Sequence, residues 1–216
     1  ERAGEHPETE LLGDAAWQEP REAFLRALRD GEGRAARRIA LGAEWSVEGM
    51  LGFFDHVVRP AMYEIGLLWE TGKLSAAVEH RATALALQVL SGLRLVNQPA
   101  PARRGRALVG AAPNERHELG AQMFALLLEL DGWQVSYLGA DTPVVDFVGL
   151  VAQERPRVVG ISVAMPFNLG RCAELIAGVR AASIDPAPRI LLGGHAFRHL
   201  PEVAAGLGGA PSDQQQ

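Results

Sequence analysis

The sequence holds a single cysteine, Cys172, in 216 residues. One cysteine cannot form a disulfide within the chain, and this usage is typical of a reducing cytoplasm. No apolar run approaches the roughly 20 residues that a membrane-spanning helix needs. The first residues also lack the apolar core of a secretory signal peptide. We therefore expect a cytoplasmic protein that does not enter a membrane, with Cys172 packed as a small hydrophobic residue.

The sequence also lacks an excess of positive charge. Its 21 lysine and arginine residues are outnumbered by 26 acidic residues, which gives a formal net charge of −5. Proteins that bind nucleic acid usually carry a basic surface, so we expect no direct nucleic-acid binding. The arginine clusters at 34–38 and 103–106 are typical of solvated helix and linker surfaces.

The first half of the chain has helical hydrophobic spacing. After an acidic, proline-containing tail over 1–16, apolar residues recur every three or four positions from 17 to 97. Ser46 and Ser75 are suitable N-caps for the third and fourth helices of this region. Pro60 lies inside the third helical segment, where it predicts a kink or a break. Four helices with short connections predict a four-helix bundle.

The second half has a different pattern. A linker over 98–105 follows the bundle, because its two prolines cannot continue a helix. From 106 to 210, short apolar runs alternate with amphipathic segments, as in parallel strands that helices cover on both faces. The expected strands lie at 107–112, 134–138, 158–163 and 190–192, and the expected helices at 119–130, 144–153, 170–182 and 197–205. The sequence therefore predicts a flavodoxin-like doubly wound parallel sheet.

Three short motifs follow three of these strands. The first holds His117 with Glu115 two residues before it and Gly120 three residues after it, the second begins at Ser162, and the third is the Gly193-Gly194 pair. Ligands of such sheets bind beyond the carboxyl ends of the strands, so we expect the three motifs to line one crevice. A carboxylate close to an imidazole can fix its tautomer and raise its basicity as a metal ligand.

The order and spacing of these motifs resemble the cobalamin-binding signature Asp-x-His-x-x-Gly, Ser-x-Leu and Gly-Gly. Between Gly120 and Ser162 lie 41 residues, 121–161. The resemblance implies that His117 binds cobalt from below, in place of the dimethylbenzimidazole tail of cobalamin. Glu115 matches the aspartate of the signature, and its longer side chain is a departure from the family pattern.

The same resemblance implies a set of cofactor contacts around the cobalt ligand. Gly120 would let the start of a helix pass close to the corrin, and Ser162 would meet the displaced tail, for which Gly193 and Gly194 leave room. For His195, a role on the protein surface is the alternative. The expected contacts in this half of the chain are Glu115, Arg116, His117, Gly120, Ser162, Val163, Gly193, Gly194 and His195.

The helical half adds a second resemblance. Trp69 is followed ten residues later by Glu79 and His80, a spacing similar to that in the cap bundle of cobalamin-dependent photoreceptors, the light-sensing repressors of the CarH type. This resemblance implies that Trp69 shields the upper axial ligand, that Glu79 holds its adenosyl group, and that His80 has a supporting role. Glu70 is a departure, because the family has there a histidine that can bind cobalt after illumination. A carboxylate is a poorer partner for Co(III) than an imidazole.

The sequence also resembles the photocobilins, which are relatives of these photoreceptors with the same two domains. They imply biliverdin as a candidate second chromophore, which is compatible with the loss of the upper histidine. The residues that would line a bilin cavity are Phe53, His56, Trp69 and His80. The bundle offers no cysteine for covalent attachment of a bilin.

Together these resemblances predict a sensor rather than an enzyme. The chain would bind cobalamin, in its adenosyl form, and light would alter the upper ligand and the packing of the bundle. An unidentified signalling partner or a fused effector domain would carry the output, because no helix-turn-helix domain is present, and we expect a homo-oligomer, with a dimer favoured. The alternative is a corrinoid carrier for methyl transfer with the same His117, and a third hypothesis is a flavodoxin-like interaction domain without a cofactor.

Overall fold

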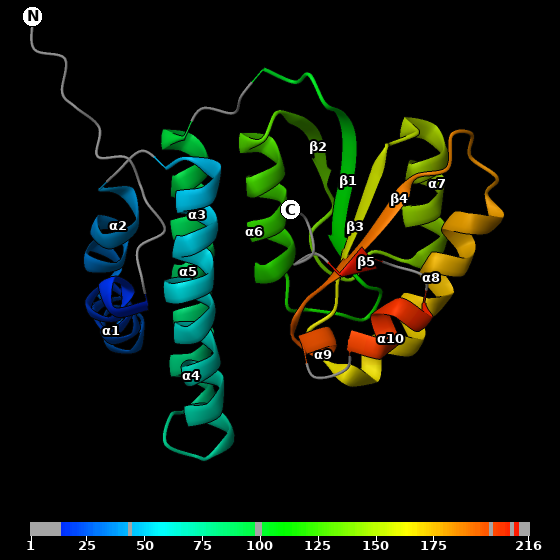
Figure 1. The fold of residues 1–216 in the computed structure, drawn as a ribbon. Helices are drawn as coiled ribbons and strands as arrows, with labels where there is room; N and C mark the ends of the chain where they lie inside the picture. Colours follow the sequence, from blue (N-terminus) through cyan, green and yellow to red (C-terminus); the bar gives the residue numbers. More distant parts are fainter. Residues whose placement is uncertain (1–13, 43–44, 98–100, 199–200, 208–209, 212–216) are drawn as a thin grey trace, which may run out of the picture. The chain divides into compact units, whose positions relative to one another are not determined.

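The computed structural model describes residues 14–42, 45–97, 101–198, 201–207 and 210–211. The chain divides into two compact units, Glu1–Gln98 and Pro99–Gln216 (Figure 1). Several element boundaries differ from the expected ones by a few residues. The first helix begins at Asp14, inside the expected tail, because Ala15 and Ala16 are helical but exposed and so add nothing to the apolar pattern. The first strand begins at Gly105, the last residue of the expected linker.

The first unit is helical, as predicted. Ser46 and Ser75 cap their helices, and their hydroxyl oxygens accept hydrogen bonds from the backbone N–H groups of Gly49 and Val78, respectively. Among the described residues of the whole chain, no helix is both long enough and apolar enough to cross a membrane. The elements are α1 (Asp14–Asp30), α2 (Gly33–Leu41), α3 (Val47–Phe53), the π-helix η1 (Phe54–Val58), α4 (Arg59–Glu70) and α5 (Ala76–Val96).

The break expected at Pro60 takes the form of a π-helical segment. In an α-helix the residue at position 60 would donate a hydrogen bond to the His56 carbonyl, which proline cannot do. Instead the chain widens just before Pro60, and the Arg59 N–H donates to the Phe54 carbonyl, five residues back. The helix therefore runs on from α3 to α4, although Pro60 cannot donate a hydrogen bond to the His56 carbonyl.

Aromatic rings fill part of the core of the helical unit. Phe53 is 1% exposed and packs against Phe24 and Trp45, with ring centroids 6.0 and 5.2 Å apart. Trp17 stacks between Trp45 and His56, at 6.2 and 5.9 Å. Phe53 is therefore a packed core residue. Its expected place in the lining of a bilin cavity stays a prediction.

The second unit contains a parallel sheet in the order β2-β1-β3-β4-β5. This is the flavodoxin-like order, so the predicted fold class is confirmed. The sequence pattern missed β5, because it contains only two residues. The strands are β1 (Gly105–Ala111), β2 (Trp133–Tyr137), β3 (Val158–Ser162), β4 (Arg189–Gly193) and β5 (Ala210–Pro211).

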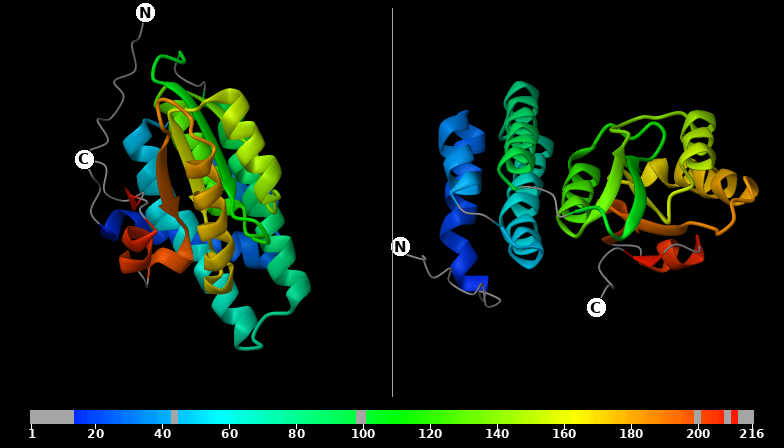
Figure 2. Two further views of the ribbon diagram at one scale, coloured as in Figure 1. Left: turned by 90° about the vertical axis from the view of Figure 1, so that its right-hand side faces the viewer. Right: turned by 90° about the horizontal axis from the view of Figure 1, so that it is seen from above.

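Helices cover both faces of this sheet (Figure 2). Helix α6 (Leu119–Leu130) packs on one face, through Ala121, Ala125 and Leu128. Helices α7 (Val144–Glu154) and α8 (Leu169–Ala181) pack on the other. The helix expected at 197–205 is instead two helices, α9 (His195–Arg198) and α10 (Pro201–Gly206). The proline at position 201 starts the second of them, which is a favoured position for proline.

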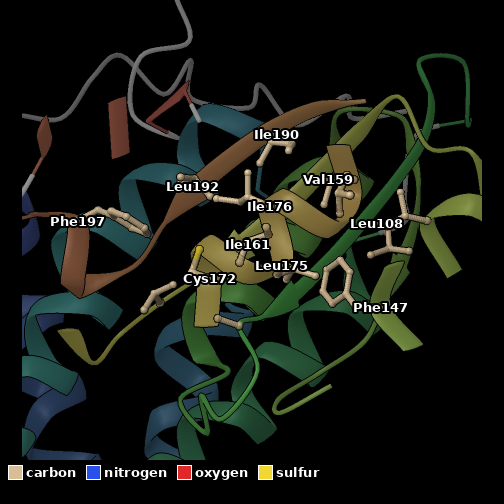
Figure 3. Close-up of a cluster of buried hydrophobic side chains, with 14 of the residues drawn as sticks. Leu108, Phe147, Val159, Ile161, Cys172, Leu175, Ile176, Ile190, Leu192 and Phe197 are labelled. Carbon is tan, nitrogen blue, oxygen red and sulfur yellow. The ribbon is translucent and has the colours of Figure 1, made fainter. Parts of the chain in front are cut away.

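Cys172 lies on α8 in a cluster of buried hydrophobic residues of the α/β unit, as Figure 3 shows. It is fully buried, and burial raises the pKa of its thiol to about 12. A thiol that stays protonated and enclosed behaves as a small hydrophobic residue, as predicted.

The end of β4 approaches the backbone of β3 very closely. Gly194 has a φ angle of +105°, and a Cβ atom at this position would lie 2.3 Å from the Val163 carbonyl oxygen. Only glycine can adopt this conformation at this separation. The glycine pair therefore has a structural cause, the contact with Val163, in addition to the expected space for a ligand.

We predict that Gly194→Ala lowers the free energy of unfolding by about 3 kcal/mol, because it combines a positive φ angle with a backbone clash. Gly149→Ala in α7 is the matched control, since nothing in the described part of the chain lies within 4 Å of its Cβ position. That variant should be unchanged or more stable by up to about 1 kcal/mol. Urea denaturation of the cofactor-free chain measures both, and similar values for the two variants would contradict the assignment.

Candidate functional site

The three sequence motifs meet at the carboxyl edge of the sheet. Ala111, which ends β1, is in register with Ser162 at the end of β3, and Ser162 is in register with Gly193 at the end of β4. The loop that carries His117 leaves β1 at this edge and enters α6 at Leu119. The strand register therefore places the three motifs side by side in this unit, as expected.

Glu115 is the centre of the loop after β1. Its side chain has no exposed surface. One carboxylate oxygen, Oε1, accepts a hydrogen bond from the His117 backbone N–H at 3.0 Å and lies 2.6 Å from Nδ1 of the His117 ring. The longer side chain, a departure from the aspartate of the cobalamin signature, thus still reaches the imidazole.

The second carboxylate oxygen of Glu115 is held by a different loop. Oε2 accepts hydrogen bonds from the backbone N–H groups of Ala164 and Met165, at 3.0 and 2.9 Å. It also accepts one from the side-chain amide of Asn168, at 3.0 Å. The carboxylate therefore joins the loop after β1 to the loop after β3.

These contacts keep the carboxylate charged. Burial by itself would raise the pKa of Glu115, but the hydrogen bonds from His117, Met165 and Asn168 outweigh this effect and lower the pKa from 4.5 to about 2. An ionised carboxylate can only accept hydrogen bonds. The proton of the His117 ring must then lie on Nδ1, so that Nε2 is the nitrogen with a lone pair for a metal.

Two further contacts fix the backbone of the His117 loop. Asn114 adopts a left-handed conformation with a φ angle of 67°, and its N–H donates to the Asp141 carboxylate at 2.8 Å. The Asp141 N–H donates in turn to the Glu115 carbonyl at 3.1 Å. Asp141 belongs to the loop after β2. Hydrogen bonds of Asn114 and Glu115 therefore link the loop after β1 to the loops after β2 and β3.

The remaining predicted contacts in this unit lie in different environments. The His117 side chain is 61% exposed, Arg116 is exposed and His195 is half-buried. Val163 is fully buried in the core cluster, so its side chain packs inside the unit.

Gly120 lies beside Ser162. A Cβ atom on Gly120 would approach the Ser162 hydroxyl to 3.1 Å, and that hydroxyl is on a side chain only 8% exposed. A glycine in this position therefore keeps the start of α6 and the end of β3 from crowding each other.

The predicted site residues of the helical unit lie on two helices. Trp69 lies in the last turn of α4 and is 48% exposed. Glu79 and His80 lie in the first turns of α5, with 3.5 Å between Glu79 Oε2 and His80 Nε2. The Thr83 hydroxyl donates to Glu79 Oε1 at 2.9 Å and so orients this carboxylate.

Sequence reasoning missed Asn168 and Thr83. Neither belongs to a spaced motif, so only local chemistry could have indicated them. For Asn168, the available signal was a polar residue in an apolar segment directly after a buried strand. For Thr83, it was the four-residue spacing from Glu79 on a helix, which places the two side chains on one face.

Comparisons with known proteins point to cobalamin-binding proteins. Residues 105–210 match a family model described as a B12 binding domain, and residues 20–94 match a second model with the same description. The HTH-type transcriptional repressor CarA of Myxococcus xanthus is 32% identical over 202 residues, which are 92% of this chain and 64% of the repressor. Dimethylamine corrinoid protein 3 of Methanosarcina acetivorans is 25% identical over 137 residues, 62% of this chain and 63% of that protein.

Among solved structures, the monomethylamine corrinoid protein of Methanosarcina barkeri has the same fold. It superposes with a TM-score of 0.72 at 15% sequence identity, over 90% of this chain and 92% of that chain. The chain spans less than two thirds of the length of the curated relatives named above.

A parallel sheet with a carboxylate-held imidazole at its carboxyl edge defines a cofactor-binding α/β domain. The matched family model specifies the cofactor, and residues 105–210 belong to the B12-binding domain family. The chain is thus a cobalamin-binding protein.

The residues present fit this cofactor. Cobalt in such a cofactor accepts nitrogen donors, and His117 would be the residue of this unit that holds it. His117 has the required chemistry, because its Nδ1 is engaged by Glu115 and its side chain is largely exposed.

We predict that Glu115→Gln lowers the free energy of unfolding by roughly 1.5–3 kcal/mol at pH 7, because a buried, charged acceptor of several hydrogen bonds is lost. The folded-state pKa of Glu115, about 2, lies below its ordinary value of 4.5. The advantage of the wild type is therefore present above about pH 4.5 and is lost as the pH falls toward 2.

Glu118→Gln is the matched control for this experiment. Glu118 lies in the same loop, is half-buried and accepts a hydrogen bond from the Tyr137 hydroxyl at 2.9 Å, which a glutamine can also accept. Its free energy of unfolding should change by less than about 0.5 kcal/mol. An equal decrease in the free energy of unfolding in the two variants would contradict the claim that Glu115 stabilises these loops more than Glu118 does.

Proposed function

We propose that this chain is a cobalamin-dependent light sensor in which His117 is the lower axial ligand of cobalt. The observation that carries the proposal is the short contact between Glu115 Oε1 and His117 Nδ1, 2.6 Å, from a carboxylate without exposed surface. Such a partner fixes the tautomer and the direction of a ligand imidazole. The lower side of the site is thus preorganised by the chain itself.

The displaced tail of the cofactor would lie near Ser162. Gly120 and Gly193 flank this serine, through the close approach at its hydroxyl and through the strand register. The absence of side chains at both positions supports a role in accommodating the tail. Arg116 and His195 are then candidates for contacts with the polar periphery of the cofactor.

For the upper side, we propose that the helical unit supplies Trp69 as the cover of the axial ligand and Glu79 as the contact to an adenosyl group. Trp69 is a large aromatic residue with about half of its surface exposed, which supports an interaction outside the core of its own unit. Glu79 is oriented by Thr83 and accompanied by His80. Bound adenosylcobalamin supplies a cobalt–carbon bond that light can break.

Glu70 distinguishes this chain from the photoreceptors that it resembles. It is exposed at the C-terminal end of α4, where those proteins have a histidine. Because a carboxylate is the weaker partner for Co(III), the response would depend on the repacking of Trp69 rather than on a second histidine ligand. Biliverdin beside the cobalamin is the further candidate for light absorption.

A corrinoid carrier for methyl transfer is the second candidate function. It is favoured by the relatives that are corrinoid proteins and by the fold of one of them. A carrier would use the same His117 but would have to expose the upper face of the cofactor to a partner enzyme. The repressor relatives, of higher identity, and the spacing of Trp69 and Glu79 favour the sensor.

We propose that an unidentified signalling partner protein or a fused effector domain carries the output of the sensor. We also propose an oligomer, with a dimer favoured, and a cytoplasmic location. The acidic net charge supports an output other than direct nucleic-acid binding by this chain.

We predict that illumination of the chain loaded with adenosylcobalamin changes its absorption spectrum and its oligomeric state. Spectroscopy and size-exclusion chromatography with light scattering, under anaerobic conditions, measure both. Trp69→Ala should bind cobalamin but lose the change of oligomeric state, whereas Trp45→Phe, a substitution in the core ring stack, should keep it.

Two outcomes would count against the sensor. An unchanged spectrum and oligomeric state after illumination would exclude it. Methylation of the bound cofactor, reduced to Co(I), by methyltetrahydrofolate or a methylamine with its partner methyltransferase, with release of tetrahydrofolate or the demethylated amine, would favour the carrier instead. Expression with biliverdin tests the second chromophore, since a bound bilin would add a red absorption band beyond the bands of cobalamin.

A further inference from the structure

A basic surface lies at the amino edge of the sheet, the edge opposite to the three motifs. Of the ten arginines that follow residue 98, seven lie in the last helical turns, the loops and the first strand residues that form this edge, against four acidic residues. The arginines are Arg103, Arg104, Arg106, Arg155, Arg157, Arg180 and Arg189, and the acidic residues are Glu129, Asp131, Glu154 and Asp185. The whole chain has a formal net charge of −5, so this edge differs in sign from the rest.

Three of these arginines stand at the starts of neighbouring strands. The Arg157 backbone N–H donates to the Arg106 carbonyl at 2.9 Å, and the Arg189 N–H donates to the Arg157 carbonyl at 2.8 Å. All three residues are exposed. Because strands in a sheet lie about 4.8 Å apart, three like charges lie near one another. This arrangement is unfavourable until anions bind to it.

Ion pairs account for only part of this positive charge. Arg104 pairs with the Asp131 carboxylate at 2.8 Å, and the Arg157 guanidinium donates to the Arg104 carbonyl at 3.0 Å. Within the part of the chain that the structure describes, neither Arg106 nor Arg189 forms an ion pair. These two arginines can therefore bind an anion from outside the chain without breaking an existing pair.

A hollow with an apolar floor adjoins the arginines. It has a volume of about 410 Å³ and lies between the end of α8 and the start of β4. Ile190 belongs to the core cluster of this unit, and Ile184 packs against that cluster. The surface thus offers positive charge and, beside it, room for an apolar side chain. The lining of the hollow includes Arg180, Ser183, Ile184, Pro188, Arg189 and Ile190.

We propose that Arg106, Arg157, Arg189 and this hollow form a docking surface for an acidic segment of a partner protein, with a bulky apolar residue among its carboxylates. Arginine binds carboxylates through two parallel hydrogen bonds, and the apolar residue would fill the hollow. A nucleic-acid backbone matches the arginines but has no apolar side chain for the hollow. Since the cofactor site lies at the opposite edge, this inference does not rest on the proposed function.

The test titrates the full chain with a short, fluorescein-labelled peptide of glutamates around one central leucine. Arg106→Gln/Arg189→Gln should weaken binding at least fivefold, because each exposed ion pair changes a binding constant by up to about fivefold. Arg34→Gln/Arg171→Gln is the matched control. It makes the same change of net charge at exposed positions on α2 and on the first turn of α8. This variant should weaken binding less than twofold.

Two further readouts locate the bound peptide. A peptide with serine in place of the leucine should bind at least fivefold more weakly, because an apolar side chain gains free energy when it leaves water. Backbone amide chemical shifts should move at 103–106, 155–157 and 183–190 on addition of the peptide, and should stay unchanged in the loop at 114–118.

The charge-reversed variant makes the result independent of a simple loss of binding. Arg106→Glu/Arg189→Glu should bind a peptide with lysines in place of the glutamates more tightly than the wild type does. His117→Ala should bind the original peptide with wild-type affinity, so a failure of the proposed cobalt ligand leaves this inference intact.

Three outcomes would overturn the proposal. The first is that the wild type does not bind the peptide, and the second is equal weakening in the two glutamine double variants. The third is an oligonucleotide of the same charge that binds as tightly as the peptide and is weakened by Arg106→Gln/Arg189→Gln. That result would assign the surface to nucleic acid instead.

Discussion

The buried carboxylate of Glu115 is the interaction on which the site depends. A buried charge is costly unless hydrogen bonds replace its hydration, and here both oxygens are engaged by groups from two loops. The same bonds that stabilise the charge also fix the ring proton of His117 on Nδ1. The contacts that order these loops are thus the same contacts that orient His117, the proposed metal ligand.

This arrangement separates the tasks of the two units. In the α/β unit, short, charge-assisted hydrogen bonds hold the proposed ligand His117 and its partner Glu115. The helical unit offers an exposed tryptophan and a half-buried glutamate, which are side chains that can repack. A sensor and a methyl carrier can therefore both use the proposed ligand His117 and differ in the role of the helical unit.

Much of the fold could be predicted from the sequence because local rules and tertiary packing agree. Ser46 and Ser75 are caps by their chemistry alone, and the uninterrupted apolar strands β1 and β3 indicate a sheet covered on both faces. The edge strand β5 could not be predicted, since two residues carry no periodicity. The start of α1 at Asp14 was missed because exposed alanines add nothing to an apolar stripe.

The candidate site was predictable only where a motif has fixed spacing. His117 and Ser162 follow from such a motif, and the strand register brings Ser162 and Gly193 together with the end of β1. Asn168 acts through a contact between distant loops, which no spacing encodes. Gly194 was expected to leave room for a ligand, but the backbone of Val163 also requires it. A spaced motif of this kind predicts candidate metal-binding residues, but it does not predict the residues that orient them.

The most direct test of the central claim is electron paramagnetic resonance of the Co(II) form of the loaded protein, labelled with nitrogen-15 at histidine. An axial nitrogen-14 splits the cobalt lines into triplets and an axial nitrogen-15 splits them into doublets. If the Nε2 of His117 is the lower ligand, histidine labelling will convert the triplets into doublets. If the triplets persist, the axial nitrogen belongs to the benzimidazole of the cofactor, and the account of His117 is wrong.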